Sequence, residues 1–247
     1  MKKKLIFISS LFVYALLIPL SSFASQNKGL LDMIGGSGGI SSQAVNIFLI
    51  ITVLGLAPSI LVMMTSFVRI VIVLSMVRSA IGLQQSPPNQ VMISLSLFLT
   101  FFIMSPVLEN SYYNGVVPLT EKKMSEEEAF PRIVEPFKKF MTANTRKKDI
   151  DLFIGIAKIE QPEHLEDLPI QVVIPSFMIS ELRRAFEIGF LLFLPFIIID
   201  IVVSSVLMAM GMMMMPPVMI SMPFKIIFFV IIDGWNVLVG SLIKSFV

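Results

Sequence analysis

Three charged residues lie inside long apolar stretches near the C-terminus: Asp200, Lys225 and Asp233. A charge at membrane depth is costly, so such residues normally face a bundle interior or a watery cavity. If their segments form a hairpin that turns near Met213 and Met214, Asp200 and Lys225 lie about 20 and about 17 Å from the turn. We therefore predict that they pair across the hairpin or across a subunit boundary. The favoured role is to fix helix register, and ion or proton handling is the alternative.

The remaining residue types give no sign of catalytic chemistry. The chain has no cysteine, which excludes disulfides, iron–sulfur clusters and thiol catalysis. Its one histidine, His164, lies in a loop-like Gln-Pro-Glu-His context and cannot form a metal cluster alone. The sequence contains no phosphate-binding glycine motif and no converging nucleophile or paired carboxylates. We predict no catalytic site, no metal, no cofactor and no enzyme activity.

A run of four methionines followed by two prolines separates two apolar segments: Met212, Met213, Met214, Met215, Pro216 and Pro217. Methionine is unbranched and polarizable, so a cluster packs against itself yet can repack when something passes. The prolines are expected to stop the preceding helix, because they donate no backbone hydrogen bond and restrict the residue before them. On local sequence alone, methionine as a good helix former at the end of a membrane helix is the simpler interpretation. A deformable seal in a pathway is the alternative.

Composition indicates an integral membrane protein, since 55% of the residues are hydrophobic and 15% are charged. Of the 36 Asp, Glu, Lys and Arg residues, 25 lie between Glu109 and Glu187, which indicates one water-facing insert. Three N-terminal lysines, an apolar run over 5–20 and a Ser22-Phe23-Ala24 site indicate a cleavable signal peptide, with a retained helix as the alternative. Beyond residue 24 the chain has 16 basic and 17 acidic residues, so we expect no nucleic-acid partner.

We predict four apolar segments, at about residues 45–64, 91–108, 188–210 and 218–232. Pro58 is expected to kink or divide the first. Export by a signal peptide places the mature N-terminus outside the cytoplasm. Arg69 and Arg78 then fall on the cytoplasmic side, as the positive-inside bias expects, and the charged insert returns to the periplasmic side.

The turn at residues 211–217 departs from this topology. It should be cytoplasmic, yet it has no lysine or arginine. Irregular backbone at membrane depth is tolerated only where protein buries it or where it lines a cavity. We therefore expect this turn at the centre of an assembly.

The charged insert contains one clear helical pattern. From Phe137 to Phe153 the large apolar residues recur at helical spacing, which predicts a helix with one packed face. Arg146 and Asp149 are three residues apart and can pair on its polar side.

A polar turn is predicted between this insert and the third apolar segment. Within it, Glu181 can reach Arg184, and Arg183 can reach Glu187. A solvated charged turn is the default interpretation. Its position beside a membrane segment favours a role in subunit contacts.

Six stretches carry a resemblance to a known family: residues 65–70 (Thr-Ser-Phe-Val-Arg-Ile), 78–90, 136–153, 180–182 (Ser-Glu-Leu), 190–217 and 233–235 (Asp-Gly-Trp). In this order they resemble the bacterial FliP family of flagellar biosynthesis proteins, which is shared with the injectisome branch of type III secretion. The resemblance runs from about Ile40 to the end, apart from residues 109–130. Ser86 stands where threonine is usual, and a fourth methionine stands where three are common. The closeness of the match favours the flagellar branch.

The resemblance implies an all-α membrane protein whose helical hairpins assemble into a pentameric ring with a helical periplasmic insert. It implies a core pore-forming component of the flagellar type III export gate, which passes unfolded flagellar subunits. The implied partners are FliQ, FliR and other membrane components of the export apparatus. The implied location is the bacterial inner membrane, multi-pass, within the basal body, with the assembled core largely at periplasmic level.

The resemblance also implies roles for individual residues. In the family, methionine loops from several copies form a gasket around the closed pore, which here corresponds to residues 212–215. The residues that we expect in subunit contacts and assembly are Glu181, Arg183, Arg184, Phe140 and Phe153.

The predicted organisation is a signal peptide (1–24), a glycine-rich flexible linker (25–39), helices 1 and 2 (40–108), a charged helical periplasmic domain (109–187), and helices 3 and 4 with the methionine loop (188–247). The rival function is a small-solute channel or secondary transporter. Such a protein often has related half-repeats and a polar site at the midplane. No convincing repeat is evident in the sequence, and only Asp200 and Lys225 hint at such a site.

Overall fold

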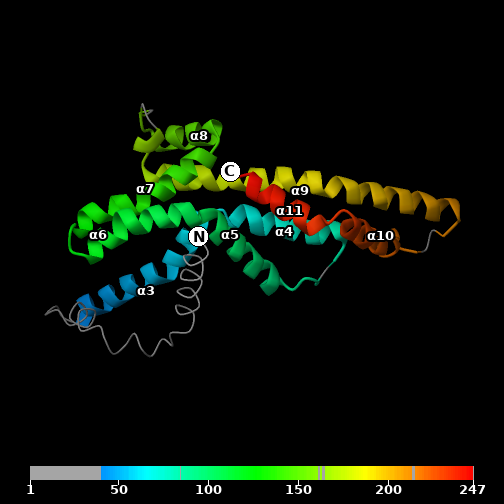
Figure 1. Cartoon of the computed structure of the whole chain (residues 1–247), viewed down its shortest axis with the longest axis horizontal. Coiled ribbons are helices and arrows are strands. Elements are labelled where there is room, and N and C mark those ends of the chain that lie inside the picture. Colours follow the sequence, from blue (N-terminus) through cyan, green and yellow to red (C-terminus); the bar gives the residue numbers. More distant parts are fainter. Residues whose placement is uncertain (1–39, 84, 161, 163–164, 213–214, 247) are drawn as a thin grey trace. The chain divides into compact units, whose positions relative to one another are not determined.

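The computed structural model describes residues 40–246 except 84, 161, 163–164 and 213–214, and every regular element in this part is a helix (Figure 1). The helices are α3 (Ile40–Met63), α4 (Phe67–Ile81), α5 (Asn89–Ser111), the π-helix η2 (Tyr112–Val116), α6 (Val117–Thr120), α7 (Glu126–Asn144), α8 (Lys147–Ala157), the 3₁₀ turn η3 (Leu165–Asp167), α9 (Ile170–Ala209), α10 (Pro217–Ile231) and α11 (Gly234–Lys244). The all-helical class predicted from the sequence is confirmed. The predicted signal peptide and linker lie outside the described residues.

The first apolar segment forms one helix, α3, which continues through Pro58. Pro58 therefore does not divide this segment, and the alternative that it kinks the helix stays a prediction. The chain separates into two compact units after Pro58, and α3 crosses that boundary.

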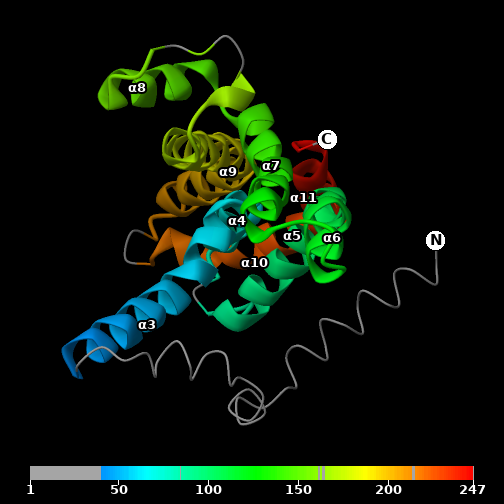
Figure 2. The same ribbon diagram turned by 90° about the vertical axis from the view of Figure 1, so that its left-hand side faces the viewer.

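Residues 59–247 form the second unit, which is organised around α9. This helix is 40 residues long and passes through Pro175 and Pro195 without ending. The helices α4, α7, α8 and α10 all pack against it. In both views α8 and α4 lie on opposite sides of α9 (Figures 1 and 2).

Two apolar cores share α9. The first joins α4, α9, α10 and α11 through buried residues that include Ile70, Val73, Leu74, Ala185, Phe196, Phe229, Leu238 and Leu242. The second joins α7, α8 and the first half of α9 through Phe137, Met141, Ile150, Ile154, Val173 and Phe177. Along α9 the change from the second core to the first falls between Phe177 and Ala185.

The connection that the sequence predicted between the first two apolar segments is a buried helix, α4. Ile70, Val73, Leu74 and Val77 are all at most 1% exposed. Their spacing of three and four residues places them on one helical face, so the pattern was present in the sequence. The helical pattern was overlooked because Arg69 and Arg78 are the basic residues expected in a cytoplasmic loop.

The polar turn predicted at residues 175–187 is also wrong, since this stretch lies inside α9. The charged residues are distributed around one helix rather than gathered in a loop. Glu181 faces the interior, whereas Arg183 and Glu187 are exposed and bond to each other one turn apart, at 2.7 Å. Pairing at this spacing supports a continuous helix.

Two helical stretches of the described chain are long and apolar enough to cross a membrane: Asn89–Thr120 and Ile170–Ala209. The helices α10 and α11 are bent by 64° at their junction and count as a third if they form one broken span. Up to three of the four predicted apolar segments therefore meet this criterion.

Candidate functional site

The turn between α9 and α10 begins at a glycine cap. Gly211 has a φ of +74°, a left-handed conformation that glycine adopts without strain. Its N–H donates to the carbonyl of Met208 at 3.0 Å, and the N–H of Met212 donates to the carbonyl of Leu207 at 3.0 Å. These are the two bonds of a Schellman motif, which satisfy carbonyls at a helix end.

The prolines of the turn begin the next helix rather than end the previous one. Pro216 is the N-cap of α10 and Pro217 its first residue, a position where proline has no bond to lose. The predicted helix break at Pro216 and Pro217 is thus corrected to Gly211. Met212 and Met215 are 40% and 44% exposed, and Met213 and Met214 lie outside the described residues. No charged residue occurs between Asp200 and Lys225 in the sequence, and the exposed side chains of Met212 and Met215 are apolar.

Asp200 and Lys225 form an ion pair within one chain. The Lys225 Nζ lies 2.7 Å from Oδ2 of Asp200 and also donates to the carbonyl of Ala80 at 3.2 Å. Ser221 donates to the other carboxylate oxygen at 2.6 Å. Ala80 lies in the last turn of α4, so Lys225 satisfies a helix-terminal carbonyl that lacks an intrahelical partner. The pair therefore ties α4, α9 and α10 together.

Asp233 lies apart from this pair, at the bend between α10 and α11. It has a φ of +50° and is exposed, and it accepts a hydrogen bond from Nδ2 of Asn236 at 3.1 Å. The next residue, Gly234, has no room for a side chain, because a Cβ there would lie 2.3 Å from the ring of Phe229. The two residues thus shape the bend.

Arg69 and Glu181 form a buried ion pair between α4 and α9. Nε of Arg69 donates to Oε2 of Glu181 at 2.8 Å, and Nη2 donates to Oε1. Neither side chain is exposed to solvent. The predicted cytoplasmic position of Arg69 and the periplasmic position of Glu181 cannot both hold, because residues in contact lie on one side of a membrane. The predicted partner of Glu181, Arg184, gives way to Arg69.

The C-terminal segment completes this cluster. Nη1 of Arg69 donates to the backbone carbonyl and to the hydroxyl of Ser245, at 3.0 and 2.9 Å. The guanidinium carbon lies 3.6 Å from the centre of the Phe246 ring. These contacts could not be predicted from local sequence, because Ser245 is 176 residues from Arg69.

The remaining residues predicted for subunit contacts lie in different surroundings. Phe140 is half-buried and stacks on Phe246, with ring centres 6.1 Å apart. Phe153 packs against the α7–α8 core. Arg183 is exposed and Arg184 half-buried.

Arg78 holds the connection between α4 and α5. Its Nη1 donates to Oδ1 of Asn89 at 2.6 Å and to the carbonyl of Pro87 at 3.2 Å. A basic residue predicted for a cytoplasmic surface thus has partners that close the loop after α4.

The single helix predicted from Phe137 to Phe153 is wrong, because the chain forms two helices there, α7 and α8, with Thr145 and Arg146 between them. The predicted pair of Arg146 and Asp149 is confirmed, with Nη2 and Oδ2 2.7 Å apart. The sequence did not indicate Ser180, whose hydroxyl donates to Asp149 and accepts from the N–H of Arg146. Burial raises the pKa of Asp149, but the hydrogen bonds from Ser180 and Arg146 and the positive charges of Arg146 and Arg183 outweigh it, so its pKa is lowered. This network fixes the start of α8 on α9.

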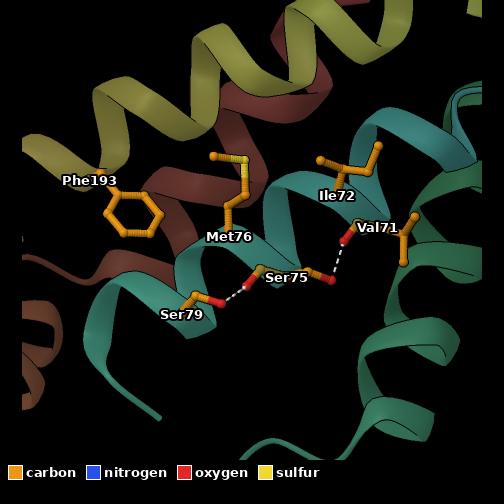
Figure 3. Close-up of a pocket in the computed structure, with 6 residues that line it drawn as sticks. All are labelled: Val71, Ile72, Ser75, Met76, Ser79 and Phe193. Carbon is orange, nitrogen blue, oxygen red and sulfur yellow. Dashed lines mark hydrogen bonds between the residues drawn. The ribbon is translucent and has the colours of Figure 1, made fainter. Parts of the chain in front are cut away.

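An open apolar hollow of about 320 Å³ lies between α4 and α9 (Figure 3). It is lined by Val71, Ile72, Ser75, Met76, Ser79 and Phe193. The two serine hydroxyls donate to backbone carbonyls of their own helix, and the lining contains no charged group. The described residues also contain no group of three His, Cys, Asp or Glu side chains that could hold a metal ion.

Comparison with known proteins agrees with the resemblance of the motifs. The model of the FliP family matches residues 50–242. A flagellar biosynthetic protein FliP of Caulobacter vibrioides is 54% identical over 213 residues, 86% of this chain and 80% of that protein. The Bacillus subtilis protein of the same name is 54% identical over 83% of this chain and 93% of its own length. That of Agrobacterium fabrum is 46% identical over 96% of this chain and 98% of its own length. The chain therefore belongs to the FliP family.

Proposed function

We propose that this chain is the core pore-forming component of the flagellar type III protein export gate, through which unfolded flagellar subunits cross the inner membrane. Membership of the FliP family and the names of its relatives support a role in flagellum biosynthesis. The observation that carries the pore-forming role is the turn between α9 and α10, which has no charged residue and whose Met212 and Met215 are exposed. A cytoplasmic loop of a membrane protein usually has basic residues, and this turn has none.

The methionines of this turn, Met212 to Met215, act as the gasket of the closed pore. Several copies of the chain would place many thioether side chains in one plane, which closes a lumen by apolar contact and dewetting. Each contact is weak, so a polypeptide under a driving force displaces them without breaking a strong bond.

Assembly follows from the apolar surface that a single chain leaves uncovered. Side chains more than 55% exposed line both α9 and α10: Phe190, Leu191, Ile198 and Ile201, and Met219 and Ile231. Patches of this kind indicate contact with protein or membrane. We propose that other copies of the chain, in a pentameric ring, cover part of this surface, and that FliQ, FliR and other membrane components of the export apparatus cover the rest.

The location that fits this role is the bacterial inner membrane within the basal body. Residues 1–24 would direct export, 25–39 would link them to the helices, and the insert at 109–187 would lie on the periplasmic side. The contact of Arg69 with Glu181 draws α4 to that same side, which supports a core assembled largely at periplasmic level.

The described residues contain no constellation that suggests catalysis, so the energy for export is assigned to other components. A small-solute channel or secondary transporter remains the rival. Its one supporting observation is Asp200, a carboxylate 34% exposed on an apolar helix.

Deletion of the gene distinguishes these two functions. The export gate predicts loss of the filament and of secreted flagellar subunits, with uptake of small solutes unchanged, and restoration by the wild-type gene. A deletion strain that secretes flagellar subunits normally would overturn the proposal.

A further inference from the structure

We infer that Ser245 and Phe246 form a clasp that closes over the buried Arg69–Glu181 pair and joins the two apolar cores of the protein. The clasp residues are positioning residues: they hold the Arg69 guanidinium in the plane that Glu181 requires. This inference does not depend on the proposed function.

The hydrogen bonds of Arg69 show why Glu181 alone is an incomplete partner. The carboxylate engages Nε and Nη2, which leaves Nη1 on the far side of the guanidinium. Both bonds from Nη1 go to Ser245. Arginine keeps its charge in proteins, so a buried guanidinium with one nitrogen unbonded would be strongly disfavoured.

Phe246 supplies the second part of the clasp. Its ring lies against the guanidinium at 3.6 Å, the geometry of a cation–π contact. The same ring stacks on Phe140 of α7, which meets Phe177 of α9 edge-on at 5.9 Å. Phe246 packs against the core of α4 and α9, while Phe140 packs against the core of α7 and α8. One side chain thus bridges both cores at the level of the ion pair.

The bend between α10 and α11 delivers the clasp. Without the 64° change of direction at Ile232–Asp233, α11 would continue away along α10. The bend turns Leu238 and Leu242 into the first core, where they are 1% and 0% exposed. The helix then ends at Lys244, directly before Ser245. Asp233 and Gly234 shape this bend by their conformation and close packing. They therefore help to place Ser245 and Phe246 beside Arg69.

Thiol labelling tests the clasp, because the chain has no cysteine and any introduced thiol is the only one. Ser245→Cys keeps the backbone carbonyl that accepts from Arg69 and leaves Phe246 in place, so in the purified, detergent-solubilised protein it should react slowly with a maleimide. Adding Phe246→Leu keeps apolar volume but removes the ring, and should raise the rate about tenfold, equivalent to about 1.4 kcal/mol of closure. Adding Phe246→Tyr keeps the ring and should leave the rate unchanged. Ser241→Cys, at an exposed position of α11, is the matched control and should react equally fast with Phe246 unchanged, with Phe246→Leu and with Phe246→Tyr.

The comparison of leucine with tyrosine separates positioning from packing. If Phe246 were only a filler of apolar space, Phe246→Leu and Phe246→Tyr would label alike. That result would overturn the clasp. So would a Ser245→Cys thiol that reacts as fast as Ser241→Cys in the otherwise unchanged chain.

A second variant approaches the clasp from the other side. Arg69→Lys keeps the charge but lacks the planar fork that binds Glu181 and Ser245 together. It should also raise the labelling rate of Ser245→Cys. A rate equal to that of the unchanged chain would contradict the assigned role of Arg69. Because labelling is measured on purified protein, neither result depends on whether the protein exports anything.

Discussion

Arg69 and Glu181 are 112 residues apart in the sequence and form a fully buried ion pair that joins α4 to α9. The pair lies where the two cores meet along α9. A buried pair is weak evidence for stability, because desolvation opposes the attraction. Loss of one partner is a different matter, because it leaves the other charge buried and uncompensated.

Replacing Glu181 with alanine should therefore destabilise the protein by about 3–5 kcal/mol and weaken ring assembly, with membrane insertion intact. Native electrophoresis of the solubilised protein should show smaller species, and denaturant unfolding should give the loss of stability. Glu187→Ala, which removes an exposed carboxylate on the same helix, is the matched control and should change neither measurement. Unchanged complexes of Glu181→Ala at wild-type expression would contradict the prediction.

The pair of Asp200 and Lys225 gives a second prediction. Asp200→Ala leaves the ammonium of Lys225 with only the Ala80 carbonyl and should cost about 3–5 kcal/mol, less where the half-exposed site admits water. Asp200→Ala combined with Lys225→Met removes both charges and should recover part of that loss. A double-mutant cycle on unfolding free energies measures the coupling, and strict additivity would show that the pair contributes nothing.

Ser66 gives a prediction of opposite sign. Its side chain is fully buried, and its hydroxyl has no hydrogen-bond partner among the described residues. Burying an unpaired hydroxyl is unfavourable, so Ser66→Ala should stabilise the protein by about 1 kcal/mol. Ser176→Ala is the control, because that equally buried hydroxyl bonds to the carbonyl of Val172 at 2.6 Å and its loss should not stabilise. The measurement is the thermal unfolding of both variants. A loss of stability in Ser66→Ala would show that this hydroxyl has a hydrogen-bond partner.

Asp149 makes the α8–α9 contact sensitive to acid. Its pKa is lowered in the folded protein, so its contribution to stability is complete above the ordinary value of 3.8 and is lost as the pH falls through the lower, folded value. The contribution of Asp149 to the free energy of unfolding should be constant near neutral pH and should fall below about pH 4. Unfolding of Asp149→Asn measured over the same range should show a shallower fall. Parallel curves for the two proteins would exclude this carboxylate as a source of the acid sensitivity.

The sequence predicted what depends on local pattern. Composition and apolar runs gave the helical membrane class, and spacing gave the Arg146–Asp149 and Arg183–Glu187 pairs. Isolated charge in apolar helices indicated Asp200 and Lys225 as partners, which the structure joins within one chain.

What the sequence could not give depends on contacts between distant segments. Glu181 has Arg184 within reach on its own helix, and nothing in the local sequence shows that its hydrogen-bond partner is Arg69 instead. The stretch around residue 181 was mistaken for a polar turn because it is rich in charged residues. A helix with one buried and one charged face can have the same composition. The stop of α9 at Gly211 was masked by the more obvious prolines, although glycine after a helix is itself a stop signal.

Variants of the methionine turn test whether this chain forms the closed pore of an export gate. Replacing Met212, Met213, Met214 and Met215 with alanine removes apolar volume where we propose that the pore is closed. Assembly should be largely intact, since the ion pairs and both cores are untouched. Replacing the four with isoleucine, a branched and stiffer side chain, should keep the pore closed and reduce export. Met124→Ala, in the charged insert, is the control and should alter neither the closure of the pore nor export.

The most direct measurement is ion conductance or small-solute entry in cells that lack the outer filament, made alongside native electrophoresis of the same complexes. If the methionines close the pore, the alanine variant assembles and leaks, whereas the wild type, the isoleucine variant and Met124→Ala stay tight. An alanine variant that assembles fully and stays tight would show that the methionines do not close the pore and have an ordinary packing role.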